Sequence, residues 1–278
     1  MSQEPTRDSL FASPLGEATR FKFNQAVVDV FPDMLRRSIP GYESIITQSG
    51  LLAQRYAQPG TRLYDLGSSL GATALALRSA LCNSPTTIAT TDATAPHPLT
   101  EIEPITEVPD DKPDYEIHAI DNSAAMITES RKVITLDTSD INRHIPVQVH
   151  EADLSEYPLD NASVVAMNFT LQFIAPEARN TLMARIANSL LPGGALILSE
   201  KVCFDDTTVN DLHIDMYHAF KSANGYSELE ISQKRNALEN VLVPDTLDTH
   251  QKRLKDAGFS HSTVWFQCFN FASIIAIK

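Results

Sequence analysis

The sequence predicts one α/β domain whose mostly parallel sheet ends in an antiparallel pair of strands. Strand and helix patterns alternate along the middle of the chain, and two apolar strand patterns close it with only a short turn between them. The 278 residues are 43% hydrophobic and 21% charged, which is enough apolar material for a large core. Two domains would also fit this length, but we interpret residues 1–278 as a single domain.

Seven short apolar runs have the composition of strands, and five of them precede the final pair. In chain order they are residues 61–67 (TRLYDLG), 115–121 (YEIHAID), 147–153 (VQVHEAD), 163–169 (SVVAMNF), 195–201 (ALILSEK), 262–269 (STVWFQCF) and 271–278 (FASIIAIK).

Helix patterns lie between these strands and would cover both faces of the sheet. Residues 71–81 are rich in Ala and Leu, and residues 122–136 carry apolar side chains two turns apart on one face. Residues 176–191 form an amphipathic pattern that Pro192-Gly193-Gly194 closes, and Gly258 ends a last helix.

Two segments depart from this alternation. Residues 83–115 are rich in Pro, Thr and acidic residues and have no sustained periodicity, so we expect a weakly ordered surface insertion without chemistry of its own. Residues 1–20 form an N-terminal arm.

The formal net charge of −13 argues against a nucleic-acid-binding protein, because such proteins use Lys and Arg to replace counterions on phosphates. The sequence contains no apolar run of the roughly 18 residues that a membrane span requires, and its first 20 residues hold no signal-peptide core. We therefore expect a cytoplasmic protein with small-molecule or protein partners and no membrane association.

No metal site is predicted. Cys82, Cys203 and Cys268 are far apart and form no C-x-x-C pair, so we interpret them as small buried residues. His213 and His218 are five positions apart, which would place them about 140° apart around a helix rather than on one face.

Polar residues follow four of the predicted strands, and in a parallel sheet ligands bind beyond these carboxyl ends. Gly67 and Gly71 allow a tight turn after the first strand, with the hydroxyls of Ser68 and Ser69 nearby. Asp121-Asn122, Asp153-Leu154 and Asn168 follow the next three strands. Asp121 has a second interpretation as a helix cap, but a carboxylate there is also suited to the two hydroxyls of a ribose. Together, the four strand ends suggest a bound adenosine.

The loop spacing favours S-adenosylmethionine over a dinucleotide. Asp65 precedes Gly67 by two positions, and its charge would repel a pyrophosphate but suits an ammonium and a sulfonium. A dinucleotide fingerprint places its acid about 20 residues after the glycines. Gly67 and Asp121 are 54 positions apart, and 21 without the 33-residue stretch 83–115, so the acid still falls where a ribose requires it.

Two polar segments hold further charges. Arg36, Arg37 and Tyr42 lie in DMLRRSIPGYES, and Tyr226, Lys234 and Arg235 lie in NGYSELEISQKRNALEN. The residues alone favour solvated helical faces for both segments.

From about Phe21 to Lys278 the chain closely resembles the carboxy-S-adenosyl-L-methionine synthase family. The resemblance rests on VFPDMLRRSIPGYESII, YDLGSSLGATALALR, AIDNSAAMI, NFTLQF, LPGGALILSEK, ANGYSELEISQKR, LENVL and WFQCFNF. It implies a Rossmann-like class I methyltransferase fold with a mostly parallel seven-stranded sheet. The second position of the Gly67 loop, often Cys in the family, is Ser68 here; both are small, so we expect the site to survive.

The resemblance also implies an activity and a set of contacts. The family converts S-adenosylmethionine and prephenate into carboxy-S-adenosylmethionine and phenylpyruvate, and a second enzyme uses the product to carboxymethylate wobble 5-hydroxyuridine in transfer RNA. The implied cofactor contacts are Tyr42, Gly67, Ser68, Ser69, Asp121, Asn122, Asp153, Leu154, Asn168 and Arg235.

Within this chemistry, Arg235 is our candidate for the cation that meets the developing carboxylate, through two parallel hydrogen bonds. That role replaces the surface interpretation for Arg235 only. The sequence identifies no side chain as the base, and the departing carboxylate of prephenate can itself accept the proton.

The family forms homodimers, and we expect residues 205–243 to be a helical lid and subunit contact, because they are too long for a simple crossover. Two other classes remain open. A conventional methyltransferase would convert the cofactor to S-adenosylhomocysteine without prephenate, and a non-catalytic binding protein would bind it without turnover.

Overall fold

The computed structural model describes residues 6–13, 21–82, 115–138, 145–239 and 241–278. The predicted insertion therefore lies outside the described residues, apart from Tyr115. The helices are α1 (Gln25–Ser38), α2 (Tyr42–Tyr56), α3 (Ala72–Cys82), α4 (Ala124–Leu136), α5 (Pro176–Ser189), α6 (Thr207–Ala223), α7 (Glu228–Leu238), α8 (Leu247–Asp256) and the 3₁₀ turn η1 (Leu171–Phe173). The strands are β1 (Arg62–Leu66), β2 (Glu116–Asp121), β3 (Val147–Glu151), β4 (Ala162–Asn168), β5 (Leu190–Cys203), β6 (Asp245–Thr246), β7 (His261–Cys268) and β8 (Phe271–Ile277).

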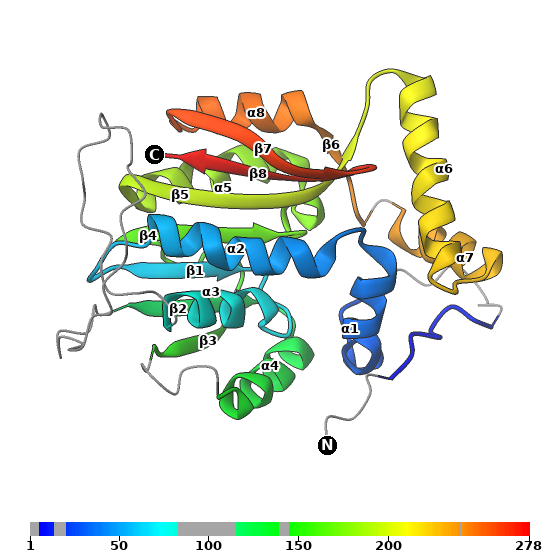
Figure 1. Cartoon of the computed structure of the whole chain (residues 1–278), viewed down its shortest axis with the longest axis horizontal. Helices are drawn as coiled ribbons and strands as arrows, with labels where there is room; N and C mark the ends of the chain where they lie inside the picture. The colour runs from blue at the N-terminus through cyan, green and yellow to red at the C-terminus, as the bar shows by residue number, and fades with distance from the viewer. Residues whose placement is uncertain (1–5, 14–20, 83–114, 139–144, 240) are drawn as a thin grey trace, which may run out of the picture.

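The sheet has the order β3-β2-β1-β4-β5-β8-β7, and the two-residue β6 pairs with β5 off this path. The first five strands of this order are parallel, whereas β8 pairs antiparallel with β5 and with β7. The predicted fold class is thus confirmed, including the antiparallel end. Figure 1 shows the strands one below another, from β7 and β8 at the top to β3 at the bottom, with α2 crossing in front of them.

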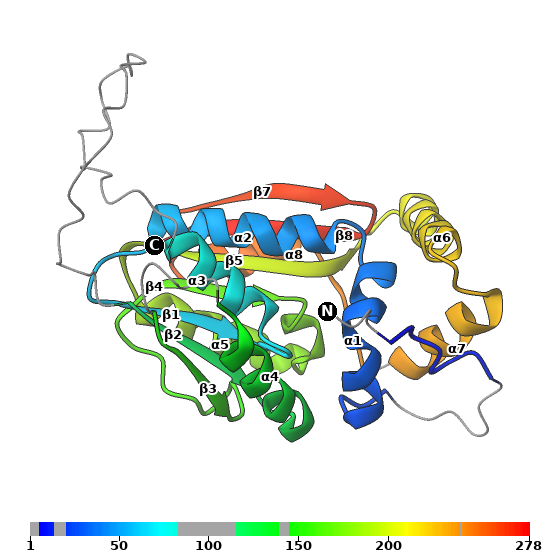
Figure 2. The same ribbon diagram turned by 60° about the horizontal axis from the view of Figure 1, so that its bottom comes forward.

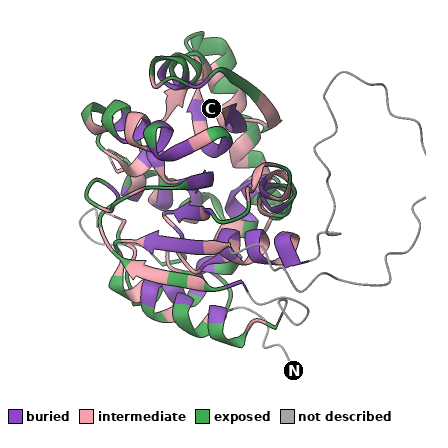
Figure 3. Ribbon diagram, turned by 90° about the vertical axis from the view of Figure 1, so that its left-hand side faces the viewer, coloured by how far each residue is buried: buried purple, intermediate pink, exposed green. Residues whose placement is uncertain are grey.

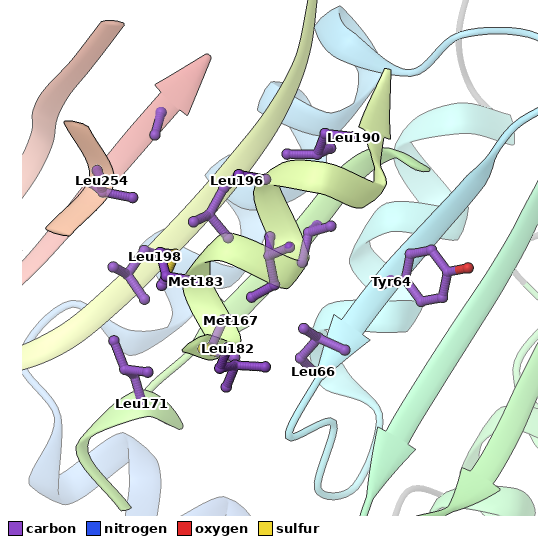
Figure 4. Close-up of a cluster of buried hydrophobic side chains, with 14 of the residues drawn as sticks. Tyr64, Leu66, Met167, Leu171, Leu182, Met183, Leu190, Leu196, Leu198 and Leu254 are labelled. Carbon is purple, nitrogen blue, oxygen red and sulfur yellow. The ribbon is translucent and has the colours of Figure 1, made fainter. Parts of the chain in front are cut away.

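Side chains alternate between two apolar layers along the central strands, as a sheet covered on both faces requires. In β1, Leu63 packs with the Ala and Leu side chains of α3, whereas Tyr64 and Leu66 pack with those of α5. Figure 3 shows the buried strands inside a more exposed shell of helices, and Figure 4 shows the α5 layer, where Leu66, Met167 and Leu182 lie together. Within the described residues, none of the helices is long and apolar enough to cross a membrane.

Three helices gather beyond one end of the sheet. Figures 1 and 2 show α1, α6 and α7 side by side at the end where the parallel strands finish. The segment 205–243 is helical as expected, and a capping box begins α7, where Ser227 and Glu230 exchange hydrogen bonds. The sequence patterns indicated a helical face for DMLRRSIPGYES but gave no sign of the earlier part of α1, which contains Pro32.

Several surface interpretations were wrong. Arg37, Tyr226 and Lys234 are 8%, 5% and 6% exposed. Arg37 donates to the carbonyls of Asp8 and Asn224, the Tyr226 hydroxyl donates to Asp8, and Lys234 donates to Ser38. Arg36 does remain half-exposed. Of the three cysteines only Cys82 is buried, whereas Cys203 and Cys268 are partly exposed.

Candidate functional site

A cavity of about 430 Å³ opens beyond the carboxyl ends of the parallel strands, between the sheet and the three end helices. Its volume is in the range of small-molecule sites. Nine of the ten residues predicted to contact the cofactor line it: Tyr42, Gly67, Ser68, Ser69, Asp121, Asn122, Asp153, Leu154 and Asn168. The tenth, Arg235, lies on the exposed side of α7 and does not line the cavity.

The loop after β1 has the backbone geometry of a close-approach site. Gly67 has φ of +78°, and a Cβ there would lie 2.1 Å from Oγ1 of Thr170. Ser69 has φ of 51° although it is not glycine, and Phe169, after β4, has φ of 60°. Such left-handed non-glycine residues are uncommon and cluster at functional sites.

Asp121 organises the wall between β1 and β2. Its Oδ2 accepts a hydrogen bond from the Ser69 amide and its Oδ1 accepts one from the Ser123 amide, each at 2.9 Å. Burial nevertheless raises the pKa of Asp121. The side chain that caps α4 is that of Ser123, so Asp121 remains free to present its other lone pairs to a ligand.

Two buried polar atoms in the cavity wall have no hydrogen-bond partner among the described residues. The hydroxyl of Ser68 and Oδ1 of Asn168 make no hydrogen bond, although Nδ2 of Asn168 donates to Thr73 at 3.1 Å. Buried polar atoms are nearly always hydrogen-bonded, so these two atoms are candidates for contacts with a ligand. A donor and acceptor pair at this position fits the polar parts of S-adenosylmethionine.

Asp65 has a different role from the one its position suggested. It is 1% exposed, does not line the cavity and accepts a hydrogen bond from the Ala74 amide in the first turn of α3 at 2.9 Å. Burial, followed by the charge of Asp121, raises the pKa of Asp65 to about 7. It therefore supports the loop from behind.

The sequence interpretation missed two lysines of the cavity wall. Lys201 ends the predicted fifth strand, so the rule that identified Asn168 would have found it, whereas Lys234 was interpreted as a surface charge. Burial lowers the pKa of Lys201 and lowers that of Lys234 to about 8.

The neighbour of Lys201 in β5, Glu200, points to the opposite face of the sheet. Its carboxylate accepts hydrogen bonds from the amides of Thr170, Leu171 and Gln172. Burial raises the pKa of Glu200 to about 8.

Comparisons with known proteins identify the family of the chain. The model of a methyltransferase domain family matches residues 105–198. A carboxy-S-adenosyl-L-methionine synthase of Trichlorobacter lovleyi is 51% identical over 271 residues, covering 98% of both chains. One from Pseudomonas putida strain KT2440 is 50% identical over 277 residues, covering all of both chains. The chain belongs to the carboxy-S-adenosyl-L-methionine synthase family.

Solved structures support the fold at a greater distance. An O-methyltransferase family protein of Burkholderia thailandensis aligns with a TM-score of 0.59 at 16% identity, covering 92% of this chain and 60% of its own. Human N-acetylserotonin methyltransferase, solved in complex with S-adenosylmethionine, aligns with a TM-score of 0.54 at 15% identity, covering 91% and 60%. This member of the carboxy-S-adenosyl-L-methionine synthase family thus has the class I methyltransferase fold. Its described residues contain no cluster of three or more His, Cys, Asp or Glu side chains suited to a metal.

Proposed function

We propose that the protein is a carboxy-S-adenosyl-L-methionine synthase, which carboxylates the methyl group of S-adenosyl-L-methionine with prephenate as the carboxyl donor. The methyl group loses a proton, and prephenate loses carbon dioxide and its ring hydroxyl as it becomes phenylpyruvate. The carbon dioxide forms the new carbon–carbon bond, and the proton and hydroxide leave as water, so the reaction needs no external oxidant or reductant.

The observation that carries the proposal is the convergence of nine predicted contact residues on one cavity, in a chain about half identical to named synthases over its full length. We assign Asp121 to the ribose hydroxyls and Asp153-Leu154 to the adenine, as their strand-end positions suggest. Ser68 and Asn168 hold unpartnered polar atoms toward the same ligand.

Prephenate requires a site that excludes water, because carbon dioxide must be captured before it escapes. The cavity wall formed by Phe23, Phe31 and Phe173 supplies such a surface, with ring centroids of Phe23 and Phe173 5.4 Å apart. We assign this apolar wall to the cyclohexadiene ring that becomes aromatic.

We further propose that the protein is a homodimer and that Arg235 enters the cavity of the neighbouring subunit. Arg235 is exposed and does not line its own cavity. On α6, next to α7, Val209, Leu212 and Met216 expose 39%, 58% and 43% of their surface on one helical face, which suits a subunit contact. The carboxylated product then serves a separate carboxymethyltransferase that acts on transfer RNA.

Incubation of the purified protein with S-adenosylmethionine, with and without prephenate, tests the proposal by mass spectrometry of the nucleoside products. We expect a product heavier by one carbon dioxide only when prephenate is present. Formation of S-adenosylhomocysteine instead would identify a methyltransferase, and unreacted cofactor would identify a binding protein. Either result contradicts the proposal.

A further inference from the structure

The cavity has a cationic end that the cofactor contacts do not explain. Lys201, near the end of β5, lines it beside Tyr217 of α6, with Nζ 4.8 Å from the ring centroid. Among the described residues no carboxylate lies within 4.0 Å of this amine. A desolvated ammonium without a counter-ion is costly, so this position favours an anionic ligand.

Lys234 of α7 adds a second amine to the same end. Its Nζ donates to the Ser38 hydroxyl at 3.0 Å and lies 3.8 Å from Oδ2 of Asp8, which also accepts the Tyr226 hydroxyl at 2.5 Å. Asp8 therefore compensates Lys234 only in part.

A third amine, which does not line the cavity, adds positive charge next to this end. Lys221 of α6 is 3% exposed and does not line the cavity, but its Nζ lies 5.3 Å from the Tyr217 ring centroid and 5.6 Å from that of Tyr226. The charges of Lys201 and Lys234 contribute to a lowered pKa of Lys221, after burial. Three amines thus share a region in which, among the described residues, Asp8 is the only carboxylate within 4.0 Å of any of them; Asp33 and Glu230 act from farther away.

An aromatic path joins this end to the cofactor contacts. Ring centroids of Tyr42 and Phe169 are 6.4 Å apart, those of Phe169 and Phe271 6.1 Å, and those of Phe271 and Tyr217 5.1 Å. All four side chains line the cavity. A ligand bound by Lys201 would therefore lie next to a ligand bound at the cofactor contacts Tyr42 and Asn168.

We propose that Lys201 and Lys234 form the carboxylate-binding subsite for the second substrate, a cyclic dicarboxylate of the prephenate type. The inference rests on the proposed function and deepens it. The two amines hold the two carboxylates while the apolar wall receives the ring. We assign both amines to the second substrate, because the ribose and adenine are already assigned to Asp121 and Asp153-Leu154.

Steady-state kinetics with Lys201→Met and Lys234→Met test this subsite, with Lys252→Met, at an exposed position on α8, as the matched control. Loss of a charge-assisted hydrogen bond predicts a rise in the KM for prephenate of roughly ten- to a hundredfold. The Kd for S-adenosylmethionine, measured by calorimetry, should change less than threefold, and the control should match the wild type.

The inference is wrong if the wild type forms carboxylated product and both variants keep its KM for prephenate, or if the variants lose cofactor affinity instead. A wild type that forms no such product would contradict the proposed function itself. If the variants do not fold, reductive methylation of lysines with formaldehyde tests the same subsite in the wild-type protein. Prephenate should protect Lys201 and Lys234 of the wild-type protein but not Lys252, and equal labelling with and without prephenate would also overturn the subsite.

Discussion

Two glycines allow the cost of a side chain at the cofactor loop to be separated from the cost of backbone strain. Gly67 and Gly60 have φ of +78° and +74°, but a Cβ at Gly60 would meet nothing within 4 Å. We expect Gly60→Ala to lower the free energy of unfolding by about 1 kcal/mol, from the left-handed backbone alone. Gly67→Ala must also displace Thr170, so it should lower that free energy further and weaken cofactor binding at least tenfold.

Chemical denaturation and calorimetry with S-adenosylmethionine measure both effects. Equal destabilisation by the two substitutions, with unchanged cofactor affinity in Gly67→Ala, would show that the Gly67 loop does not approach the ligand closely.

A buried histidine on α8 makes stability depend on pH. His250 is 2% exposed, and burial, followed by the charge of Arg253, lowers its pKa to about 4. Because the unfolded chain binds the proton near the ordinary pKa of 6.5, stability contributed by neutral His250 is complete above pH 6.5 and is lost as the pH falls toward 4. At pH 5 this loss amounts to about 2 kcal/mol.

The free energy of unfolding should fall between pH 7 and pH 5 in both proteins. We expect this fall to be smaller in His250→Gln than in the wild type, by about 2 kcal/mol. Urea denaturation at the two pH values measures this difference. His261→Gln, at an exposed position, is the control and should keep the wild-type dependence. An unchanged pH dependence in His250→Gln would show that His250 does not titrate abnormally.

At the residue level, strand-end positions predicted part of the cavity wall, but not the direction in which each side chain points. Ser68, Asp121 and Asn168 follow strands and line the cavity as expected. Asp65 follows the same rule in sequence, yet it turns behind the loop to the α3 amide. Sequence position cannot distinguish these directions, because successive side chains of a strand point to opposite faces and the loop then adds its own turn.

At the level of elements, the described part of the N-terminal arm ties α1 to α7. The Asp8 amide donates to Asp33 at 2.8 Å, and the Asp8 carboxylate accepts the Tyr226 hydroxyl and faces Lys234. The sequence could not reveal this contact, because the partners of Asp8 lie between 25 and 226 positions after it in the chain. In addition, the pattern around residue 234 resembles that of a solvated helix.

Asp8→Ala should lower the free energy of unfolding by about 3 kcal/mol, because it leaves the Tyr226 hydroxyl and the Lys234 amine buried without their partner. Asp29→Ala, which removes an exposed carboxylate of α1, should change it by less than 0.5 kcal/mol, on the order of an ordinary surface substitution. Adding Lys234→Met to Asp8→Ala should cost less than the sum of the two changes, since the unpaired charge is removed. Additive effects in urea denaturation would argue against the pairing.

At the level of the whole molecule, the strands of the sheet were predictable where local patterns were strong, but their order in the sheet was not. Five parallel strands and the antiparallel pair were identified because each is a short apolar run with turn residues after it. The helices at the end of the sheet were harder to predict from sequence patterns. For example, α6 buries only Lys221 among its 17 residues, so it has no stripe of buried apolar side chains to recognise. Within the described residues, the apolar contacts of α6 include the ring of Tyr217, which packs on Phe271.

The proposed homodimer predicts complementation between two inactive variants. Arg235→Ala should lose carboxylated product through loss of the guanidinium, and Asp121→Ala should lose it through loss of cofactor binding. If Arg235 acts across the interface, a mixed dimer regains one complete site, so dimers purified with two different affinity tags should show about half of the wild-type rate. Arg131→Ala, on the exposed surface of α4, is the matched control for Arg235→Ala and should keep full activity. Inactive mixed dimers would indicate that Arg235 acts in its own subunit. In that case α7 would have to move, because Arg235 does not line the cavity of its own subunit in this structure.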